Sequence, residues 1–425
     1  MSFNIRILSS SIIKAFGSAL CATPSPLGRA GVGLLGRAGV GLSVCLFLCG
    51  CITEYEAKGL DDIADILVVE GIITDDETTI TLVRSINMSS ATSSAPVFNF
   101  VNDAVVSVEC DDGTAFTAEL SNSRFDGRYT IQTGILDLNR KYRLKIEMDE
   151  RDVEFHSEFT YPIQTPEIDS VFWTKKGTGQ PVNIHVTTQS PENKIQYYRW
   201  SYREDWEVVS DFFIEYSDMC RFCAAFCNGA EICPKCGLKK ERYPSYCWGT
   251  ANNKTILLGA AEKNVFGRVI DLLTEINPSD DKLMKLYRID VRQNTISKQA
   301  HDYFTNIRKN SQLTGSIFAS TPSELRGNIL CYTEPGRPVI GYIDVSSTTH
   351  KRLYIPGSAN VYERPVSKCG IYTEEEWCPD LKGCLWPPNG WIYWDDEQCV
   401  DQFCVDCTYG RNTTTNKPDD WPNDH

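Results

Sequence analysis

The stretch Tyr142-Arg-Leu-Lys-Ile-Glu-Met148 alternates apolar and charged residues at every position. A period of two with one charged face is typical of a half-buried antiparallel strand. Turn signals recur around this stretch at Asp112-Gly113, Asp126-Gly127 and Leu138-Asn139, a spacing that indicates short strands joined by tight turns. We therefore expect residues 66–165 to form a β-sandwich.

The same alternation continues beyond residue 166, at Val182-Asn-Ile-His-Val186 and at Tyr287-Arg-Ile-Asp-Val291. The roughly 375 residues that follow residue 50 exceed what one hydrophobic core usually fills. We expect a second, larger β-rich domain over residues 166–425, so the predicted fold class is mainly β. One or two helices are expected within that domain.

The clearest helix follows Ser297, a residue type that caps helix N-termini well. Apolar residues then recur at helical spacing, at Ala300, Tyr303, Phe304 and Ile307. This stripe predicts core packing rather than a ligand site. An aromatic strand lies upstream, and its period of two places three residues on one face, where we expect core packing: Tyr198, Trp200 and Tyr202.

The first 50 residues contain four basic residues and no acid. Within them the run Ala38–Leu48 is small and apolar, about the length of a signal-peptide core and shorter than the roughly 20 residues that span a bilayer. We interpret residues 1–50 as an export signal. Residues 51–65 are rich in acids and are expected to form a tether.

The residues Leu48-Cys49-Gly50-Cys51 resemble the lipobox of bacterial lipoproteins. That resemblance implies cleavage before Cys51 and lipidation of its thiol, with no other cofactor. Acyl chains contribute about 0.8 kcal/mol per buried methylene, so more than one chain anchors a protein stably. The alternatives are an ordinary secretory signal with an incidental cysteine, or a buried hairpin of apolar residues.

The formal net charge of the whole chain is −14, and loss of the four basic residues of the leader would change it to −18. Recognition of nucleic-acid phosphates needs a basic face. The composition therefore disfavours a nucleic-acid partner. It suits a protein with a well-solvated surface.

Several segments, taken in order, resemble the domain of unknown function 4249 (DUF4249) family of Bacteroidota outer-membrane lipoproteins. They begin at Leu67-Val-Val-Glu-Gly-Ile-Ile73 and continue through Tyr197-Tyr-Arg-Trp-Ser-Tyr-Arg-Glu-Asp-Trp206, Gly315-Ser-Ile-Phe318, Pro322-Ser-Glu-Leu-Arg-Gly-Asn-Ile329, Val339-Ile-Gly-Tyr342, Cys404-Val-Asp-Cys407 and Lys417-Pro-Asp-Asp-Trp421. The resemblance implies an N-terminal immunoglobulin-like sandwich and a β-rich C-terminal domain. It also implies a location in the outer membrane and a TonB-dependent receptor as partner, but it supplies no reaction.

A cysteine-rich insertion over residues 218–248 departs from the family's usual pattern. Its spacing is that of a zinc ribbon, with Cys220, Cys223, Cys233 and Cys236 as the zinc ligands in that interpretation. In an oxidising compartment an even set of cysteines is more simply explained by disulfides. We expect three bridges within the set Cys220, Cys223, Cys227, Cys233, Cys236 and Cys247; structural zinc and a redox-active pair remain the alternatives.

A second even set lies in a tail rich in cysteine and tryptophan, residues 369–421, and consists of Cys369, Cys378, Cys384, Cys399, Cys404 and Cys407. We expect disulfides here too, stapling a cap whose tryptophans fill a small core. The alternative is an exposed aromatic platform for a glycan, peptide or protein, formed by Trp386, Trp391 and Trp394.

No catalytic signature stands out in the sequence. The five histidines are scattered, and neither a His-Glu-x-x-His pair nor a Gly-x-Ser-x-Gly elbow occurs. The acid pair Asp395-Asp396 could serve a hydrolase, but 56 acids make chance pairs common. We therefore expect a non-enzymatic accessory or ligand-presenting lipoprotein; the alternatives are a surface hydrolase that binds glycans or peptides, and a structural envelope protein.

Overall fold

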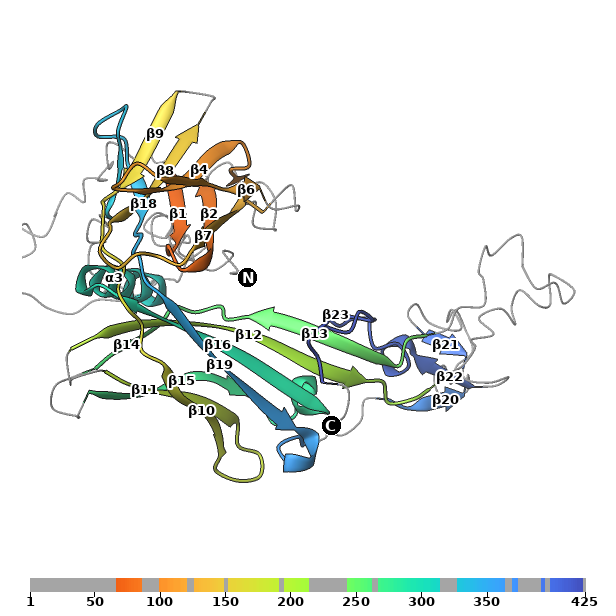
Figure 1. The fold of residues 1–425 in the computed structure, drawn as a ribbon. Helices are drawn as coiled ribbons and strands as arrows, with labels where there is room; N and C mark the ends of the chain where they lie inside the picture. Colours follow the sequence, from red (N-terminus) through yellow and green to blue (C-terminus); the bar gives the residue numbers. More distant parts are fainter. Residues whose placement is uncertain are drawn as a thin grey trace, which may run out of the picture.

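The structure of the protein is a computed structural model. The structure describes residues 66–85, 99–120, 126–148, 152–190, 195–213, 243–261, 267–313, 327–363, 369–373, 391–393 and 398–422. Within these ranges the fold is mainly β, as predicted, with several antiparallel sheets and one α-helix. Figure 1 shows two halves, one above the other, with helix α3 between them at one end.

The upper half in Figure 1 contains two sheets. The first has the order β18-β1-β2-β7-β6, with β3 beside β2, and comprises β1 (Leu67–Gly71), β2 (Asp76–Arg84), β3 (Asn99–Phe100), β6 (Glu119–Leu120), β7 (Arg128–Gly134) and β18 (Val339–Gly341). The second has the order β17-β9-β8-β4-β5 and comprises β4 (Ala104–Cys110), β5 (Ala115–Thr117), β8 (Tyr142–Met148), β9 (Val153–Ser157) and β17 (Ile329–Cys331).

The alternating stretch from Tyr142 to Met148 forms strand β8, as predicted. Its apolar residues are buried and its charged residues are partly exposed along the whole strand. Leu144 and Ile146 join one hydrophobic core with Ile80 and Ile131 of the first sheet. The two sheets therefore bury their apolar faces against each other, which is what a period of two requires of a half-buried strand.

Two strands of the upper half come from far along the chain. β17 pairs with β9 in antiparallel fashion, and β18 pairs with β1 in parallel. Both lie within residues 166–425, the range expected to form the second domain. The chain thus returns to the first half after building most of the second, and each of these strands completes an edge of a sheet.

The lower half is built on a long, twisted sheet with the order β19-β16-β12-β13-β23, and with β14 also paired to β12. Its strands are β12 (Tyr197–Val209), β13 (Tyr246–Asn252), β14 (Leu257–Ala260), β16 (Leu286–Ile296), β19 (Thr348–Pro356) and β23 (Thr413–Thr414). A three-stranded sheet, β10-β11-β15, lies below it and comprises β10 (Ile168–Lys175), β11 (Val182–Gln189) and β15 (Arg268–Ile276).

One face of β12 packs into the core between these two sheets. Tyr198, Trp200 and Tyr202 are all buried there, as predicted. The indole N–H of Trp200 donates to Gln293 Oε1 at 2.8 Å, so this buried polar group is satisfied. Gly259 of β14 leaves room for the Trp200 ring, which a Cβ at that position would clash with.

The predicted helix is α3 (Lys298–Leu313). Ser297 caps it, because its Oγ accepts the N–H of Ala300 at 3.1 Å. All four residues of the expected apolar stripe are buried, in a cluster with Ile340 of β18 and Leu258 of β14. The helix therefore packs against both halves and joins them.

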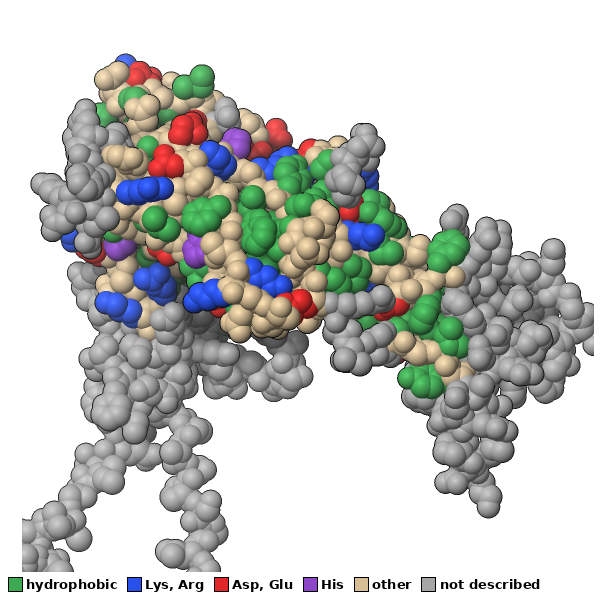
Figure 2. All heavy atoms as spheres, turned by 90° about the horizontal axis from the view of Figure 1, so that it is seen from below, with side chains coloured by type: hydrophobic (Ala, Val, Ile, Leu, Met, Phe, Trp, Pro, Cys, Tyr) green, Lys and Arg blue, Asp and Glu red, His purple; other side chains and the backbone are tan. Residues whose placement is uncertain are grey.

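A third, small sheet stands at the far end of the lower half, with the order β20-β22-β21. Its strands are β20 (Ile371–Thr373), β21 (Trp391–Tyr393) and β22 (Gln398–Asp401), and three 3-10 helices complete the described elements: η6 (Asp281–Leu283), η7 (Gly357–Ala359) and η8 (Gln402–Cys404). The underside of the molecule carries hydrophobic side chains among charged ones (Figure 2). Ile270 and Leu272 of β15 are exposed. Across the described ranges, no helix combines the length and the apolar character needed to span a bilayer.

Candidate functional site

A cavity of about 340 Å³ lies between the two halves. Strands β1 and β2 and the residues that connect them form one wall, which carries threonines and acids that include Glu70, Asp75 and Glu77. Strands β12, β16 and β19 form the opposite wall, which includes Arg199 and Arg292. A pocket between two units of a fold, lined by converging polar groups, is a common place for a small ligand.

The ion pair between Glu70 and Arg199 is part of the lining of this cavity. Arg199 Nη2 lies 3.0 Å from Glu70 Oε1, and both side chains are largely buried, with exposed fractions of 9% and 13%. The Arg199 guanidinium also stacks over Phe304 of α3, 4.5 Å from the ring centroid. Burial raises the pKa of Glu70, and Arg199 partly offsets that rise. One arginine therefore joins β1, β12 and α3.

The polar face of the long sheet continues from this cavity into a second one of about 230 Å³. The two cavities share Ser201 and Arg292, which are partners in the register between β12 and β16. Because side chains alternate along a strand, the residues on this face recur at every second position. Four arginines line the second cavity: Arg203, Arg288, Arg292 and Arg352.

Arg288 lies at the centre of the ion pairs in this second cavity, which we call the arginine pocket. Its Nη2 lies 2.7 Å from Asp205 Oδ2, and its Nη1 lies 2.8 Å from Asp420 Oδ1. Burial lowers the pKa of Arg288, but the bonds to Asp205 and Asp420 outweigh burial and raise it. Arg352 Nη2 contacts Asp290 at 2.6 Å and Asp420 at 2.9 Å.

The residues that build both cavities lie mainly within one family match. The model of the domain of unknown function DUF4249 matches residues 52–352, about seven-tenths of the chain. The chain belongs to the DUF4249 family. Curated proteins give no match to it. The family match confirms the resemblance drawn from the sequence motifs.

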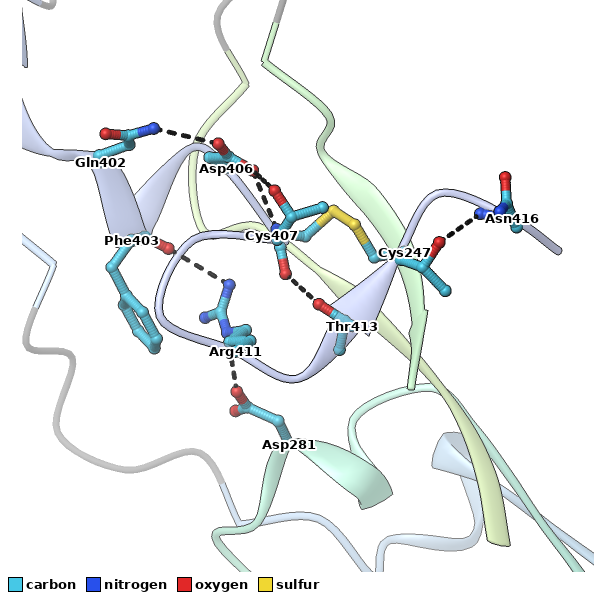
Figure 3. The surroundings of a disulfide bond; sticks show 11 residues. Cys247, Asp281, Gln402, Phe403, Asp406, Cys407, Arg411, Thr413 and Asn416 are labelled. Atoms are coloured by element: carbon cyan, nitrogen blue, oxygen red, sulfur yellow. Dashed lines mark hydrogen bonds and ion pairs between the residues drawn. A yellow bond between two sulfur atoms is a disulfide. The ribbon is translucent and has the colours of Figure 1, made fainter. Parts of the chain in front are cut away.

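The DUF4249 match ends at residue 352, and the described segments from residue 369 onward form a cap held by two disulfides. Cys247 of β13 is bonded to Cys407, and Cys369 is bonded to Cys404. Figure 3 shows the first bridge and, beside it, Arg411, whose Nε lies 3.1 Å from Asp281 of η6. The cap has a small core of its own, which consists of Tyr243, Val400, Cys404 and Val405 with neighbouring apolar groups.

The first of these pairings corrects an expectation about the cysteines. The bridge from Cys247 to Cys407 joins the two sets that were expected to pair internally, because β13 and the tail segment around β23 are neighbours in the long sheet. In addition, Cys110 and Cys331 are buried and free. They lie on β4 and β17, which two other strands separate. An even count of cysteines therefore does not mean that every one is paired.

Several predicted site residues lie outside the described ranges. They are the lipidation residue Cys51, the cysteines Cys220, Cys223, Cys227, Cys233, Cys236, Cys378 and Cys384, the tryptophans Trp386 and Trp394, and the acids Asp395 and Asp396. Trp391 and Cys399 belong to described strands, but their side chains are not described. In the part of the chain that is described, no group of three or more His, Cys, Asp or Glu residues could hold a metal ion.

The arginine pocket was not anticipated from the sequence. The alternation at Tyr287-Arg-Ile-Asp-Val291 predicted a strand, and its apolar residues are indeed buried. The same alternation places Arg288, Asp290 and Arg292 together on the opposite face. One feature of the sequence could have revealed the pocket. Arginine recurs on the polar face of this strand, although the chain as a whole is acidic.

Proposed function

We propose that this DUF4249 protein is a non-enzymatic outer-membrane lipoprotein, anchored through Cys51, that presents a small ligand to a TonB-dependent receptor. The lipobox-like residues before Cys51 support the anchor. Membership of the family supports the location and the type of partner. The observation that carries the ligand role is the pair of joined polar cavities, which expose arginines and carboxylates along one face of the long sheet.

The first described strand begins at Leu67. The tether expected over residues 51–65 and the proposed anchor at Cys51 both precede it and lie outside the described residues.

We also propose that the two sheets of the upper half form an immunoglobulin-like sandwich. The support is their shared hydrophobic core and their predominantly antiparallel pairing. Strands β17 and β18, which come from much later in the chain, would then be additions to the edges of that sandwich. Such an arrangement suits a rigid platform that holds one wall of the cavity between the halves.

Affinity purification from solubilised outer membranes tests the proposed partnership. The chain would carry a tag at its C-terminal end and be expressed at its natural level, with an untagged strain as the control. We expect a large β-barrel receptor to co-purify with the tagged chain and to be absent from the control. Recovery of the tagged protein without any such receptor, also after chemical cross-linking in cells, would contradict the proposal.

A further inference from the structure

The carboxylate of Asp420 occupies the arginine pocket in the manner of a bound ligand. Its Oδ1 lies 2.8 Å from Arg288 Nη1, and its Oδ2 lies 2.9 Å from Arg352 Nη2. Each oxygen thus meets a different guanidinium. Contacts of this length between a guanidinium N–H and a carboxylate oxygen are charge-assisted hydrogen bonds, which are stronger than neutral ones.

The residue next to Asp420 anchors the segment independently of this contact. Trp421 is only 3% exposed, and its indole N–H donates to Glu207 Oε1 at 2.6 Å. The Arg288 guanidinium lies over the Trp421 ring, 5.0 Å from its centroid. Asp420 itself stays half exposed, with 54% of its side chain accessible. Its carboxylate can therefore leave the pocket while Trp421 keeps the segment in place.

The charges of the pocket favour an anion once Asp420 has moved away. Four arginines line it, and Arg203, Arg288 and Arg352 also pair with Asp205, whose side chain is fully buried, or with Asp290. This gathering of four arginines occurs in a chain whose formal net charge is −14. Arg292 extends the pocket toward the larger cavity, which offers room for the rest of a ligand.

We propose that the arginine pocket binds a small ligand through a carboxylate group and that Asp420 holds the place of that carboxylate until the ligand displaces it. The ligand class is a carboxylate-bearing small molecule, either a sugar acid or the C-terminus of a short peptide. Arg288 and Arg352 bind its carboxylate, and the polar walls of the adjoining cavity accept its remaining groups. This inference deepens the ligand-presenting role proposed above and rests on it.

Calorimetric titration of the purified full-length chain tests the site, with glucuronate and diglycine as the two probes and glucose as the neutral control. The central variant is Asp420→Asn, which removes the competing charge. Its matched control is Asp419→Asn, since Asp419 is the exposed neighbouring acid. We expect Asp420→Asn to bind at least one of the two probes at least tenfold more tightly than the unmodified chain, and Asp419→Asn to bind like the unmodified chain.

A further change in the Asp420→Asn background identifies the site. Adding Arg352→Gln should reduce probe affinity at least tenfold, and glucose should bind to none of the variants. If neither probe binds to folded Asp420→Asn, or if its affinity equals that of the unmodified chain, the inference is wrong. Tighter binding of inorganic phosphate than of both probes would overturn the carboxylate assignment. Should Asp420→Asn fail to fold, Asp420→Ser provides the same test.

The outcome is separable from that of the receptor experiment. Calorimetry uses the purified chain without a receptor, and co-purification needs no added ligand. Binding of a probe without recovery of a receptor would retain the site but reject the proposed partner. Recovery of a receptor without probe binding would retain the partner and reject this site.

Discussion

Arg199 on β12 and Glu70 on β1 form a largely buried ion pair, with 3.0 Å between Arg199 Nη2 and Glu70 Oε1, and this pair joins the two halves of the protein. The two residues are 129 positions apart in the chain. Because the pair borders the larger cavity, it fixes the position of one cavity wall relative to the other. Changes at this pair should therefore affect both stability and the shape of the site.

Replacing Arg199 by Met should lower the free energy of unfolding by about 3–5 kcal/mol, because it leaves the Glu70 carboxylate buried without its partner. The double variant Arg199→Met with Glu70→Met should recover most of that loss. Arg203→Met is the matched control, since Arg203 lies on the same strand face but is 52% exposed; it should cost less than about 1 kcal/mol. Chemical denaturation measures all four proteins, and equal losses for Arg199→Met and Arg203→Met would contradict the assignment.

The disulfide from Cys247 to Cys407 should stabilise the protein more than the one from Cys369 to Cys404. The first closes a loop of 160 residues and the second a loop of 35. Loop-closure entropy predicts losses of about 5 and about 4 kcal/mol when each is replaced by a pair of serines. Thermal unfolding under non-reducing conditions measures the difference. A larger loss for the shorter loop would show that closure entropy does not govern these bridges.

Asp420 should make a pH-dependent contribution to stability. Its hydrogen bond to Arg288 lowers its pKa below the ordinary 3.8. A carboxylate with a lowered folded-state pKa stabilises the protein above its unfolded-state value, and it loses that contribution as the pH falls through the folded-state pKa.

The difference in unfolding free energy between the unmodified chain and Asp420→Asn should therefore be constant at pH values well above 3.8 and should shrink progressively as the pH falls below that value. The difference should be small, because Asp420 is half exposed. Denaturation curves at several pH values measure it, with Asp419→Asn as the control. A difference that persists unchanged to pH 3 would mean that the Asp420 charge does not act through this contact.

The sequence was sufficient to predict features that depend on local periodicity. The alternation from Tyr142 to Met148 identified a half-buried strand, and the spacing after Ser297 identified helix α3 with its cap. The burial of Tyr198, Trp200 and Tyr202 followed from the same reasoning. In each case the pattern reports which side chains share a face, and that is a property of the local backbone.

The features that could not be predicted depend on contacts between distant segments. Asp205 and Glu207 lie on the polar face of β12, yet both are buried, because that face is covered by Arg288 and by the segment that carries Trp421. Periodicity does not reveal what covers a face. For the same reason the pairing of β18 with β1 and the bridge between Cys247 and Cys407 could not be inferred from spacing alone.

Membrane fractionation of the unmodified chain and of Cys51→Ser tests the central claim most directly, because the compartment and the receptor partner both rest on the proposed anchor. The unmodified chain should sediment with the outer membrane, and its N-terminal peptide should begin at an acylated Cys51 in mass spectrometry. Cys51→Ser should be released into the soluble periplasmic fraction. If Cys51→Ser remained in the membrane fraction, the account of this protein as a lipid-anchored accessory subunit would be contradicted.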